Sequence, residues 1–578
     1  MRKARFDRRL SIATMVLFCC LGLVAGRLVW LQVIKADRYV KLAAEQRDTV
    51  IDVTPRRGTV TDREGEILAI SEDVTTVYAT PYLVKSKSST AERIASVIGE
   101  DPASVLEKLK ADSGFVYIAR KLDHALAEKL KKMDLPGIGY LEESKRFYPV
   151  GPLSAQLIGM VDVDNKGQVG LELYYEDLLG GTKGEITLER DAAGNPIPGS
   201  EHLKQQSADG VDLQLTLDKD IQTCLMENLD AAVKRYHATA GTAIVMDCNT
   251  GDVLAMGSVP TFDPNTRNIL DPASMRNRAV TDVYEPGSAL KIVTAAGALE
   301  QGVVKPDTVI QVPSELQVAD QRFKDAEEHP ARSMTFSQVI SQSSNIGTIQ
   351  TALQLGPENM ERYLERFGLG HLTGIDFPGE VAGIVTPTSE WTGTSAATIA
   401  IGQGISITPV QLACVAGTVA NGGRKVCPHF LKAKIGDDGI KDVGLGGLGE
   451  EVLEEGTCDV LTPILEQVLG PEGTGTRAAV NYYRVAGKTG TAEKPRQGAA
   501  GYTGTYMATF VGFAPVDRPR LVCMVVLDEP SPIWGGHTAA PTFKPIMEFS
   551  LQHLKIAPSW AQQAPAAPQA PQDGGGHD

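Results

Sequence analysis

Three short stretches of the sequence carry side chains that could act together on one substrate. The first, "EPGSALK", places Ser288 three residues before Lys291. The second, "SQSSNIG", offers Ser343 and Asn345, whose spacing suits a short turn with a hydroxyl and an amide on one wall of a cleft. The third, "GKTGT", offers residues 488–491. A serine beside an uncharged amine predicts a nucleophile for acyl transfer.

The first stretch has the surroundings of an activated nucleophile. The Pro-Gly pair before Ser288 predicts a helix entry, and we expect a helix over residues 288–299. Residues three apart share a helix face, so the hydroxyl and the amine of Lys291 point into one space. The helix dipole and burial in an apolar run both disfavour the charged amine. A neutral Lys291 can take the serine proton, and backbone N–H groups at this helix end can stabilise an oxyanion.

The third stretch predicts a seat for an anion. It follows the strand-like "YYRVA", and on an extended segment alternate side chains share a face. Lys488 and Gly490 therefore face one way, and Thr489 and Thr491 face the other. A cationic lysine beside hydroxyls suits a carboxylate, and Gly490 allows a ligand to approach the strand backbone closely.

Each stretch is a weak signal when taken alone, because a turn serine and a surface lysine are common. S-x-x-K, however, occurs once in the 578 residues, and it opens an apolar segment. The order S-x-x-K, S-x-N, K-T-G, with separations of 55 and 145 residues, is a much stronger signal than any member.

The elements around these residues predict a multidomain α+β protein. Alternation or apolar runs predict strands at both ends of the C-terminal part, and helical patterns fill the middle. The expected strands are residues 211–218, 242–247, 252–258, 506–515 and 520–528, and the expected helices are 220–236, 288–299 and 336–353. Strands that enclose a helical block imply an antiparallel sheet flanked by helices.

The N-terminal part predicts a membrane anchor and an elongated α+β pedestal. Five basic residues precede a run from Leu10 to Gly26 without a charge, and a second apolar stretch continues to Ile34. A cleaved signal peptide is the alternative, although this run is longer than the usual apolar core. The pedestal mixes short strands such as 184–190 with a helical stretch over 90–110. The expected domains are a cytoplasmic tail (1–9), an anchor (10–34), a pedestal (35–210), a catalytic domain (211–555) and a disordered tail (556–578).

Composition excludes several classes of function. A net charge of −15 argues against a general nucleic-acid binder. The eight cysteines form no C-x-x-C pair, and no histidine pair has ligand spacing, so no metal site and no cofactor are expected.

With its three motifs in this order, the chain resembles the class B penicillin-binding proteins, which are peptidoglycan D,D-transpeptidases. The resemblance extends from Arg57 to about Glu548 and includes "RRGTVTDREGEILAIS", "GLELYYEDLLGGTKGE" and "GQGISITPVQLA". "YEPGSALK" is most similar to the division-specific, FtsI-type members. The C-terminal domain is therefore expected to have the fold of penicillin-binding proteins and serine β-lactamases.

The resemblance also implies roles for the site residues. Ser288 would attack the penultimate D-Ala of a stem peptide, with Lys291 as its general base. Ser343 and Asn345 would relay protons and hold the substrate amide. The substrate carboxylate would bind to Lys488 and its neighbours Thr489, Gly490 and Thr491, and β-lactams would acylate the same serine.

Expected partners and location follow from the same resemblance. They are peptidoglycan stem peptides ending in D-Ala-D-Ala, β-lactams, an FtsW-like polytopic lipid II polymerase and other division proteins. The protein is expected in the cytoplasmic (inner) membrane as a single-pass protein, with its N-terminus in the cytoplasm and its catalytic domain outside. The expected function is septal cell-wall cross-linking during cell division.

Several alternatives stay open at this point. An elongation-type transpeptidase and a D,D-carboxypeptidase use the same nucleophile, and an anchored β-lactam sensor would not catalyse at all. A β-lactamase is disfavoured because the chain contains no Leu-Asn pair, and so no E-x-x-L-N box to activate water.

Overall fold

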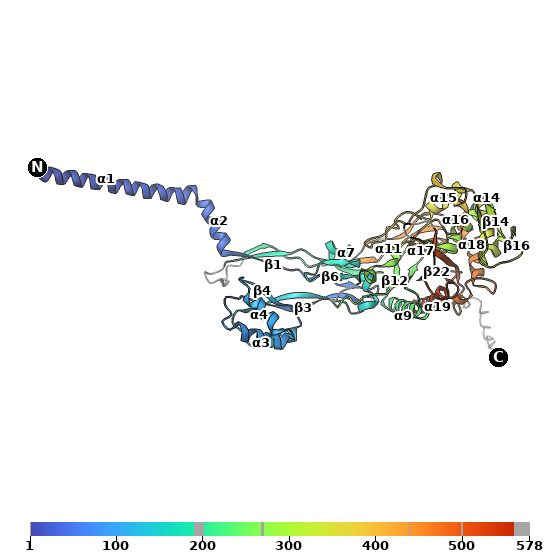
Figure 1. The fold of residues 1–578 in the computed structure, drawn as a ribbon, viewed down its shortest axis with the longest axis horizontal. Helices are drawn as coiled ribbons and strands as arrows, with labels where there is room; N and C mark the ends of the chain where they lie inside the picture. The colour runs from blue at the N-terminus through green and yellow to red at the C-terminus, as the bar shows by residue number, and fades with distance from the viewer. Residues whose placement is uncertain are drawn as a thin grey trace, which may run out of the picture. The chain divides into compact units, whose positions relative to one another are not determined.

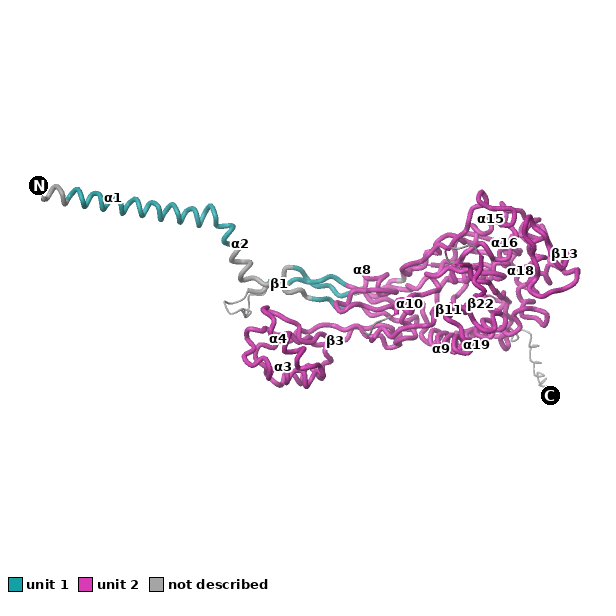
Figure 2. The backbone as a smooth tube through the Cα atoms, in the orientation of Figure 1, with its two compact units in different colours: residues 1–56, 181–210 teal, residues 57–180, 211–578 magenta. Residues whose placement is uncertain are grey.

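The computed structural model describes residues 2–189, 202–266, 271–436, 439–444, 446–496, 498 and 501–559. The chain divides into two compact units, which Figure 2 shows in teal and magenta. Unit 1 comprises residues 1–56 and 181–210, and unit 2 comprises residues 57–180 and 211–578. Contacts thus group most of the expected pedestal with the expected catalytic domain, and the boundary expected after residue 210 stays a prediction.

Unit 1 contains the expected membrane anchor. Helix α1 (Arg2–Val29) runs into a π-helical turn, η1 (Trp30–Ile34), and helix α2 (Ala36–Arg47) follows. Asp7–Ile34 is the one stretch in the described part of the chain that is long and apolar enough to cross a membrane. A small antiparallel sheet completes the unit, with the order β1 (Asp48–Val53), β8 (Gly184–Glu189), β9 (His202–Gln205).

A seven-stranded sheet in unit 2 joins segments that are far apart in the sequence. Its order is β19 (Gly439–Asp442), β18 (Leu431–Gly436), β10 (Asp212–Leu215), β2 (Val60–Thr61), β3 (Ile67–Ala79) and β4 (Val116–Leu122), with β5 (Ile138–Phe147) also paired to β3. Strands β2 and β10 are parallel neighbours. The expected pedestal and catalytic segments therefore share one sheet.

The helical stretch expected over residues 90–110 is confirmed, but it is divided at residues 99–101 into two helices. The structure has three helices beside β3 and β4: α3 (Lys87–Ile98), α4 (Pro102–Lys110) and α5 (His124–Lys131). Gly99, with φ of 74°, ends α3 in the left-handed conformation. Asp101 then caps α4 by accepting a hydrogen bond from the Ala103 amide.

A buried ionic cluster holds the first residues of unit 2 in place. The carboxylate of Glu172, which is completely buried, accepts hydrogen bonds from Arg57 Nε at 2.5 Å and from Arg146 Nε at 2.7 Å. Arg57 also donates to Glu176 at 2.7 Å. Since a buried charge without its partner is costly, the cluster holds β5 and the two helices α7 (Gly170–Tyr174) and α8 (Glu176–Leu179) against residue 57.

The second sheet of unit 2 carries the expected hairpin and the last two expected strands. It is antiparallel, with the order β12 (Val253–Val259), β11 (Ala240–Asp247), β23 (Leu521–Asp528), β22 (Tyr502–Ala514) and β21 (Ala486–Pro495). Helices α9 (Lys219–Arg235) and α19 (Ala539–His553) cover one face, and α11 (Arg278–Thr281) and α17 (Pro409–Ala420) cover the other (Figure 1). All of β11 is buried because both faces are covered: Ile244 contributes to one core cluster and Val245 to the other. The flanked antiparallel sheet and the helix over 220–236 are confirmed.

The helical block differs from the expected pattern at two places that matter for the site. The helix expected over 288–299 is a 3₁₀ turn, η3 (Gly287–Leu290), followed by α12 (Lys291–Glu300). The helix expected over 336–353 is two helices, α13 (Phe336–Ser341) and α14 (Asn345–Leu355). Ser343, at φ of 62°, interrupts the helix because α-helical backbone requires negative φ.

The remaining helices of unit 2 are η2 (Gly151–Leu153), α6 (Ala155–Ile158), α7 (Gly170–Tyr174), α8 (Glu176–Leu179), α10 (Pro272–Met275), α15 (Pro357–Arg366), η4 (Thr388–Glu390), α16 (Ser395–Ala400), α18 (Glu455–Glu466), η5 (Gln467–Leu469) and η6 (Thr476–Ala478). The remaining described strands form four two-stranded sheets. The pairs are β6 (Met160–Val161) with β7 (Gly167–Val169), β13 (Val309–Val312) with β16 (Arg332–Thr335), β14 (Leu316–Val318) with β15 (Gln321–Phe323), and β17 (Arg424–Cys427) with β20 (Gly447–Glu451).

Candidate active site

The segment that carries Ser288 is fixed by tight backbone contacts. Gly287 has φ of 53°, and its N–H donates to the carbonyl of Gly402 at 3.0 Å. A Cβ on Gly402 would lie 2.0 Å from the Gly287 carbonyl oxygen, so only glycine fits at residue 402. Ser288 is partly exposed, one turn ahead of Lys291, which is completely buried. The Ser288 hydroxyl therefore lies at the surface of a cavity, and the Lys291 amine lies behind it.

The amine of Lys291 is held by the turn between α13 and α14. Its Nζ lies 2.8 Å from the Ser343 carbonyl oxygen, 2.8 Å from Asn345 Oδ1 and 3.3 Å from Ser343 Oγ. The hydroxyl of Ser288 makes no hydrogen bond within the part of the chain that the structure describes. The structure thus brings Ser343 and Asn345 to Lys291, as the sequence predicts.

Lys488 reaches the same turn from the edge strand β21. Its side chain is completely buried, and its Nζ donates to Ser343 Oγ at 2.9 Å. The Ser343 hydroxyl therefore lies between two amines that are 197 positions apart in the sequence, at Lys291 and Lys488. A proton can pass between these amines through one hydroxyl.

The other residues of the third motif face as the strand alternation predicts. Thr489 and Thr491 line the cavity, where the Thr489 hydroxyl lies 2.6 Å from that of Thr474. Gly490 is not among the lining residues that the structure describes. A Cβ on Gly490 would lie 2.8 Å from the Pro286 carbonyl oxygen. The segment that carries Ser288, and not a ligand, therefore approaches the backbone of β21 closely at this glycine. Glycine is needed at 490 so that β21 and η3 can meet.

Burial controls the charge of both lysines. It lowers the pKa of Lys291 to about 7, with the carboxylate of Asp325 acting in the opposite direction. It also lowers the pKa of Lys488 far below its usual value, and the charge on Lys291 lowers it further. The sequence predicts a cationic Lys488, whereas burial in this structure shifts both amines toward the neutral form.

These residues surround a cleft of about 540 Å³. Ser288, Ser343 and Asn345 lie on its walls together with the two threonines of the third motif. Arg477 and the exposed His537 also line it, His537 at the rim. The further lining residues are Gly287, Asp325, Ala326, Glu327, Arg332, Gln342, Ser344, Ile401, Gln403, Glu472, Gly473, Thr474, Thr476, Trp534 and Gly536.

Asp325 is a site residue that the sequence does not reveal. Its carboxylate accepts hydrogen bonds from Ser344 Oγ at 2.7 Å and from the Ile346 amide at 2.9 Å, and it lies 3.0 Å from His329 Nε2. These contacts fix the turn that holds Lys291. No motif separates Asp325 from the acidic residues beside it in "KDAEEH", so its role becomes visible only when the fold is known.

We expect Asp325→Asn to slow acylation of the protein about tenfold, since it weakens charge-assisted hydrogen bonds that hold the turn. It should also shift the rise of the acylation rate with pH to lower pH. The reason is that the carboxylate raises the pKa of Lys291, so its loss leaves the amine neutral in more acidic solution. Stopped-flow acylation between pH 5 and 9 measures both effects.

The matched control for this prediction is Glu328→Gln, which removes one charge from an exposed position of the same loop. It should leave the rate and its pH dependence unchanged. If the acylation rate of Asp325→Asn depends on pH as that of the parent does and only its maximum is lower, Asp325 has a purely structural role.

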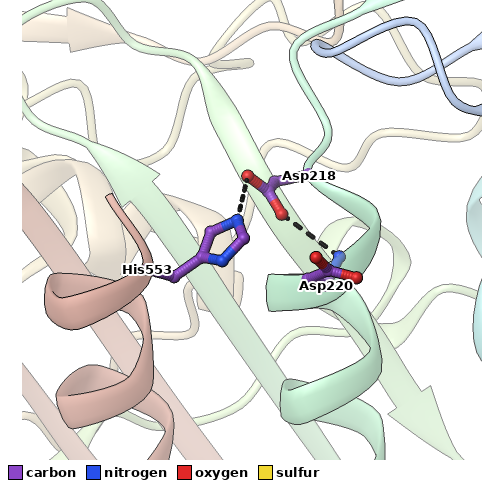
Figure 3. Close-up of side chains that lie close together, drawn as sticks. All are labelled: Asp218, Asp220 and His553. Atoms are coloured by element: carbon purple, nitrogen blue, oxygen red, sulfur yellow. Dashed lines mark hydrogen bonds and ion pairs between the residues drawn. The ribbon is translucent and has the colours of Figure 1, made fainter. Parts of the chain in front are cut away.

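One group of possible metal ligands is found among the described residues, and it lies outside the cleft. Asp218, Asp220 and His553 have ligand atoms within 4.8 Å of one another (Figure 3). Asp218 caps α9, however, because it accepts hydrogen bonds from the amides of Asp220 at 3.1 Å and Ile221 at 3.2 Å. Its other oxygen lies 3.1 Å from His553 Nε2 at the end of α19. The group therefore joins two helix ends on one face of the second sheet.

The chain is similar to known proteins over most of its length. Residues 241–548 match the family model described as the penicillin binding protein transpeptidase domain, and residues 52–215 match the penicillin-binding protein dimerisation domain. The chain is 35% identical to penicillin-binding protein PbpB of Mycolicibacterium smegmatis, across 96% of this chain and 92% of that relative. It is 33% identical to peptidoglycan D,D-transpeptidase FtsI of Escherichia coli, across 95% and 92%. The crystal structure of penicillin binding protein 3 from Mycobacterium tuberculosis in complex with aztreonam is similar, with a TM-score of 0.70 and 30% identity across 88% of this chain and 98% of that one.

Proposed function

The chain belongs to the class B penicillin-binding proteins, which are peptidoglycan D,D-transpeptidases, and from this premise we propose how its residues carry out the reaction. The observation that carries the proposal is the convergence of Lys291 and Lys488 on the Ser343 hydroxyl, beside Ser288 in one cleft.

Ser288 is the nucleophile in this proposal. Its Oγ attacks the carbonyl carbon of the penultimate D-Ala, and the hydroxyl proton passes to the neutral amine of Lys291. The tetrahedral intermediate is stabilised by the backbone N–H groups of Ser288 and Thr491. Its collapse breaks the peptide bond, and the leaving D-Ala nitrogen takes a proton, which leaves an ester on Ser288. An amine from a neighbouring stem peptide then attacks the ester, and the cross-link forms as Ser288 regains its proton.

The remaining residues bind the substrate and return the protons. The Thr489 and Thr491 hydroxyls hold the terminal carboxylate, and the approach of this anion favours protonation of Lys488 behind them. Ser343 relays the proton between the two amines, and Asn345 holds the substrate amide. A β-lactam enters as a substitute for the D-Ala-D-Ala end and stops at the acyl-enzyme.

The distinguishing experiment is a product assay with the purified full-length protein. A peptide ending in D-Ala-D-Ala is supplied with and without an acceptor amine, and D-Ala release and the amide product are measured. Acceptor-dependent amide formation supports the transpeptidase. Release of D-Ala by hydrolysis alone would assign a D,D-carboxypeptidase, and acylation by penicillin with neither product would assign a sensor.

We further propose that the protein serves septal rather than elongation synthesis, through an FtsW-like polymerase and other division proteins. Support comes from the similarity to FtsI of Escherichia coli. Depletion of the protein should produce filaments that lack septa, and swollen cells of lost shape would instead indicate elongation.

Arg27, inside the anchor, is the residue proposed to contact the polymerase. Undiminished co-purification of an Arg27→Leu variant with the polymerase would contradict that contact.

The proposed topology puts residues 1–9 in the cytoplasm and residues 35–210 outside as a pedestal for the catalytic residues 211–555. The five basic residues before the anchor support this orientation. Protease added to the outside of spheroplasts should remove the catalytic domain and leave an N-terminal tag intact. Cleavage of the tag would reverse the orientation.

A further inference from the structure

The loop of residues 324–331, between β15 and β16, holds the turn that contacts Lys291. All of these residues are described by the structure, and none of them belongs to a helix or a strand. The Lys324 carbonyl accepts a hydrogen bond from Asn345 Nδ2 at 3.0 Å, and Asp325 accepts two hydrogen bonds from the N-terminal end of α14. Because the loop has no regular structure of its own, side-chain contacts have to keep Asp325 in place.

His329 is the residue of this loop that supports Asp325. Its Nε2 lies 3.0 Å from Asp325 Oδ2, and the two side chains are only 10% and 6% exposed. Its Nδ1 lies 2.8 Å from the Pro330 carbonyl oxygen. A carbonyl and an ionised carboxylate are both acceptors, whereas a neutral imidazole has only one donor nitrogen. Both contacts are hydrogen bonds only if both nitrogens carry hydrogen, so this geometry is that of a positively charged imidazolium.

The other charged groups near this pair either face solvent or lie at the turn. Arg332, on β16, lies 3.9 Å from Asp325 Oδ2 and is 40% exposed, so solvent screens its charge. The acidic residues 327–328 of the loop are exposed. Lys291, on α12, contacts the same turn. Burial lowers its pKa, and the Asp325 carboxylate acts in the opposite direction.

We propose that His329 is a positioning residue for the general base Lys291 and that it acts through Asp325. Its imidazolium holds the Asp325 carboxylate against the turn through a charge-assisted hydrogen bond. Its positive charge also opposes the attraction of that carboxylate for a proton on Lys291. More of the neutral amine is then available to take the Ser288 proton. Lys488, from β21, is the other titratable group at this turn and contacts Ser343 instead. The inference rests on the proposed function, in which Lys291 is the base.

The test measures the rate of acylation of the full-length protein by a fluorescent penicillin between pH 5 and 9. His329→Gln keeps an N–H donor and removes the charge, so the carboxylate of Asp325 acts on Lys291 without opposition. The rise of its acylation rate should move about 0.5 pH unit higher, which makes it about threefold slower than the parent at pH 6. This shift is opposite in direction to the one expected for Asp325→Asn. A loss of packing alone would not move the two profiles in opposite directions.

Two further variants separate the charge from the hydrogen bond. His329→Arg keeps a charged donor and should return the rise to the parental pH. His329→Leu removes the donor as well, so it should shift the rise and also lower the maximum rate about tenfold. His371→Gln is the matched control, because His371 is exposed and does not line the cleft among the residues that the structure describes. It should acylate as the parent does at every pH.

The outcomes separate this inference from the proposed function. Absence of penicillin labelling in the parent protein would overturn the proposed function itself. If the parent labels normally but His329→Gln depends on pH as the parent does, or is shifted to lower pH, only the role of His329 is overturned. A shift that His329→Arg shares with His329→Gln would overturn it too, because the charge would then have no effect. Thermal unfolding identifies any variant that is not folded. If His329→Leu is unfolded, the other two variants decide, because both keep a donor for Asp325.

Discussion

Replacing Ser288 by alanine is expected to abolish covalent labelling by a fluorescent penicillin. Among the described residues that line the cleft, Ser288 is the hydroxyl one turn before the buried amine of Lys291. The substitution removes one oxygen atom from a partly exposed position, so the fold should be unaffected. Without that oxygen no ester can form, and the label should fall to background after denaturing electrophoresis.

Two controls make this result decisive. Ser96→Ala changes an exposed serine on α3 and should label at the parental rate. Thermal unfolding of Ser288→Ala should match that of the parent within a few degrees, as for most surface substitutions. Label that survives in a folded Ser288→Ala protein would move the nucleophile to another residue, and Ser343 would be the next one to replace.

Replacing Lys291 by methionine should slow acylation by about 10²–10⁴-fold, the usual contribution of a general base. Methionine preserves most of the buried volume and removes the amine that contacts Ser343 and Asn345. The serine then has to lose its proton to water or to Lys488. The acylation rate constant under pseudo-first-order conditions measures the loss.

The pH dependence of the parent protein provides a second check on the base. Burial lowers the pKa of Lys291 to about 7, so its neutral form increases as pH rises through that value. The acylation rate should therefore rise about tenfold between pH 6 and pH 8, following the fraction of neutral amine. In Lys291→Met this rise should disappear. A variant that keeps both the parental rate and the parental profile would mean that another group takes the proton.

The parts of the fold that depend on local pattern could be predicted from the sequence. Strands β11 and β12 have apolar residues around a turn with Gly251, and α9 begins at a residue type that caps helices. The three motifs also identify the site, because Ser288, Ser343 and Lys488 carry distinctive chemistry at distinctive spacings.

The features that depend on distant contacts could not be predicted. The left-handed backbone at Ser343 is unfavourable locally, and it is offset by the hydrogen bonds that Lys291 makes to its carbonyl oxygen and Lys488 to its hydroxyl. Asp325 acts only because the chain folds back to the start of α14. The burial of both lysines depends on three-dimensional packing, so the sequence cannot show that Lys488 as well as Lys291 is shifted toward its neutral form.

The parallel pairing of β2 with β10 limits how this protein can be divided. The Leu213 amide donates to the Thr59 carbonyl at 2.8 Å, and the Arg63 amide donates to the Leu217 carbonyl at 2.8 Å. A catalytic fragment starting at residue 211 would keep the cleft but expose the backbone of β10 as an open strand edge. Open edges recruit other strands, so such a fragment is prone to self-association. A soluble crystallisation or screening fragment should therefore begin before β2 and retain Arg57 with its buried carboxylate.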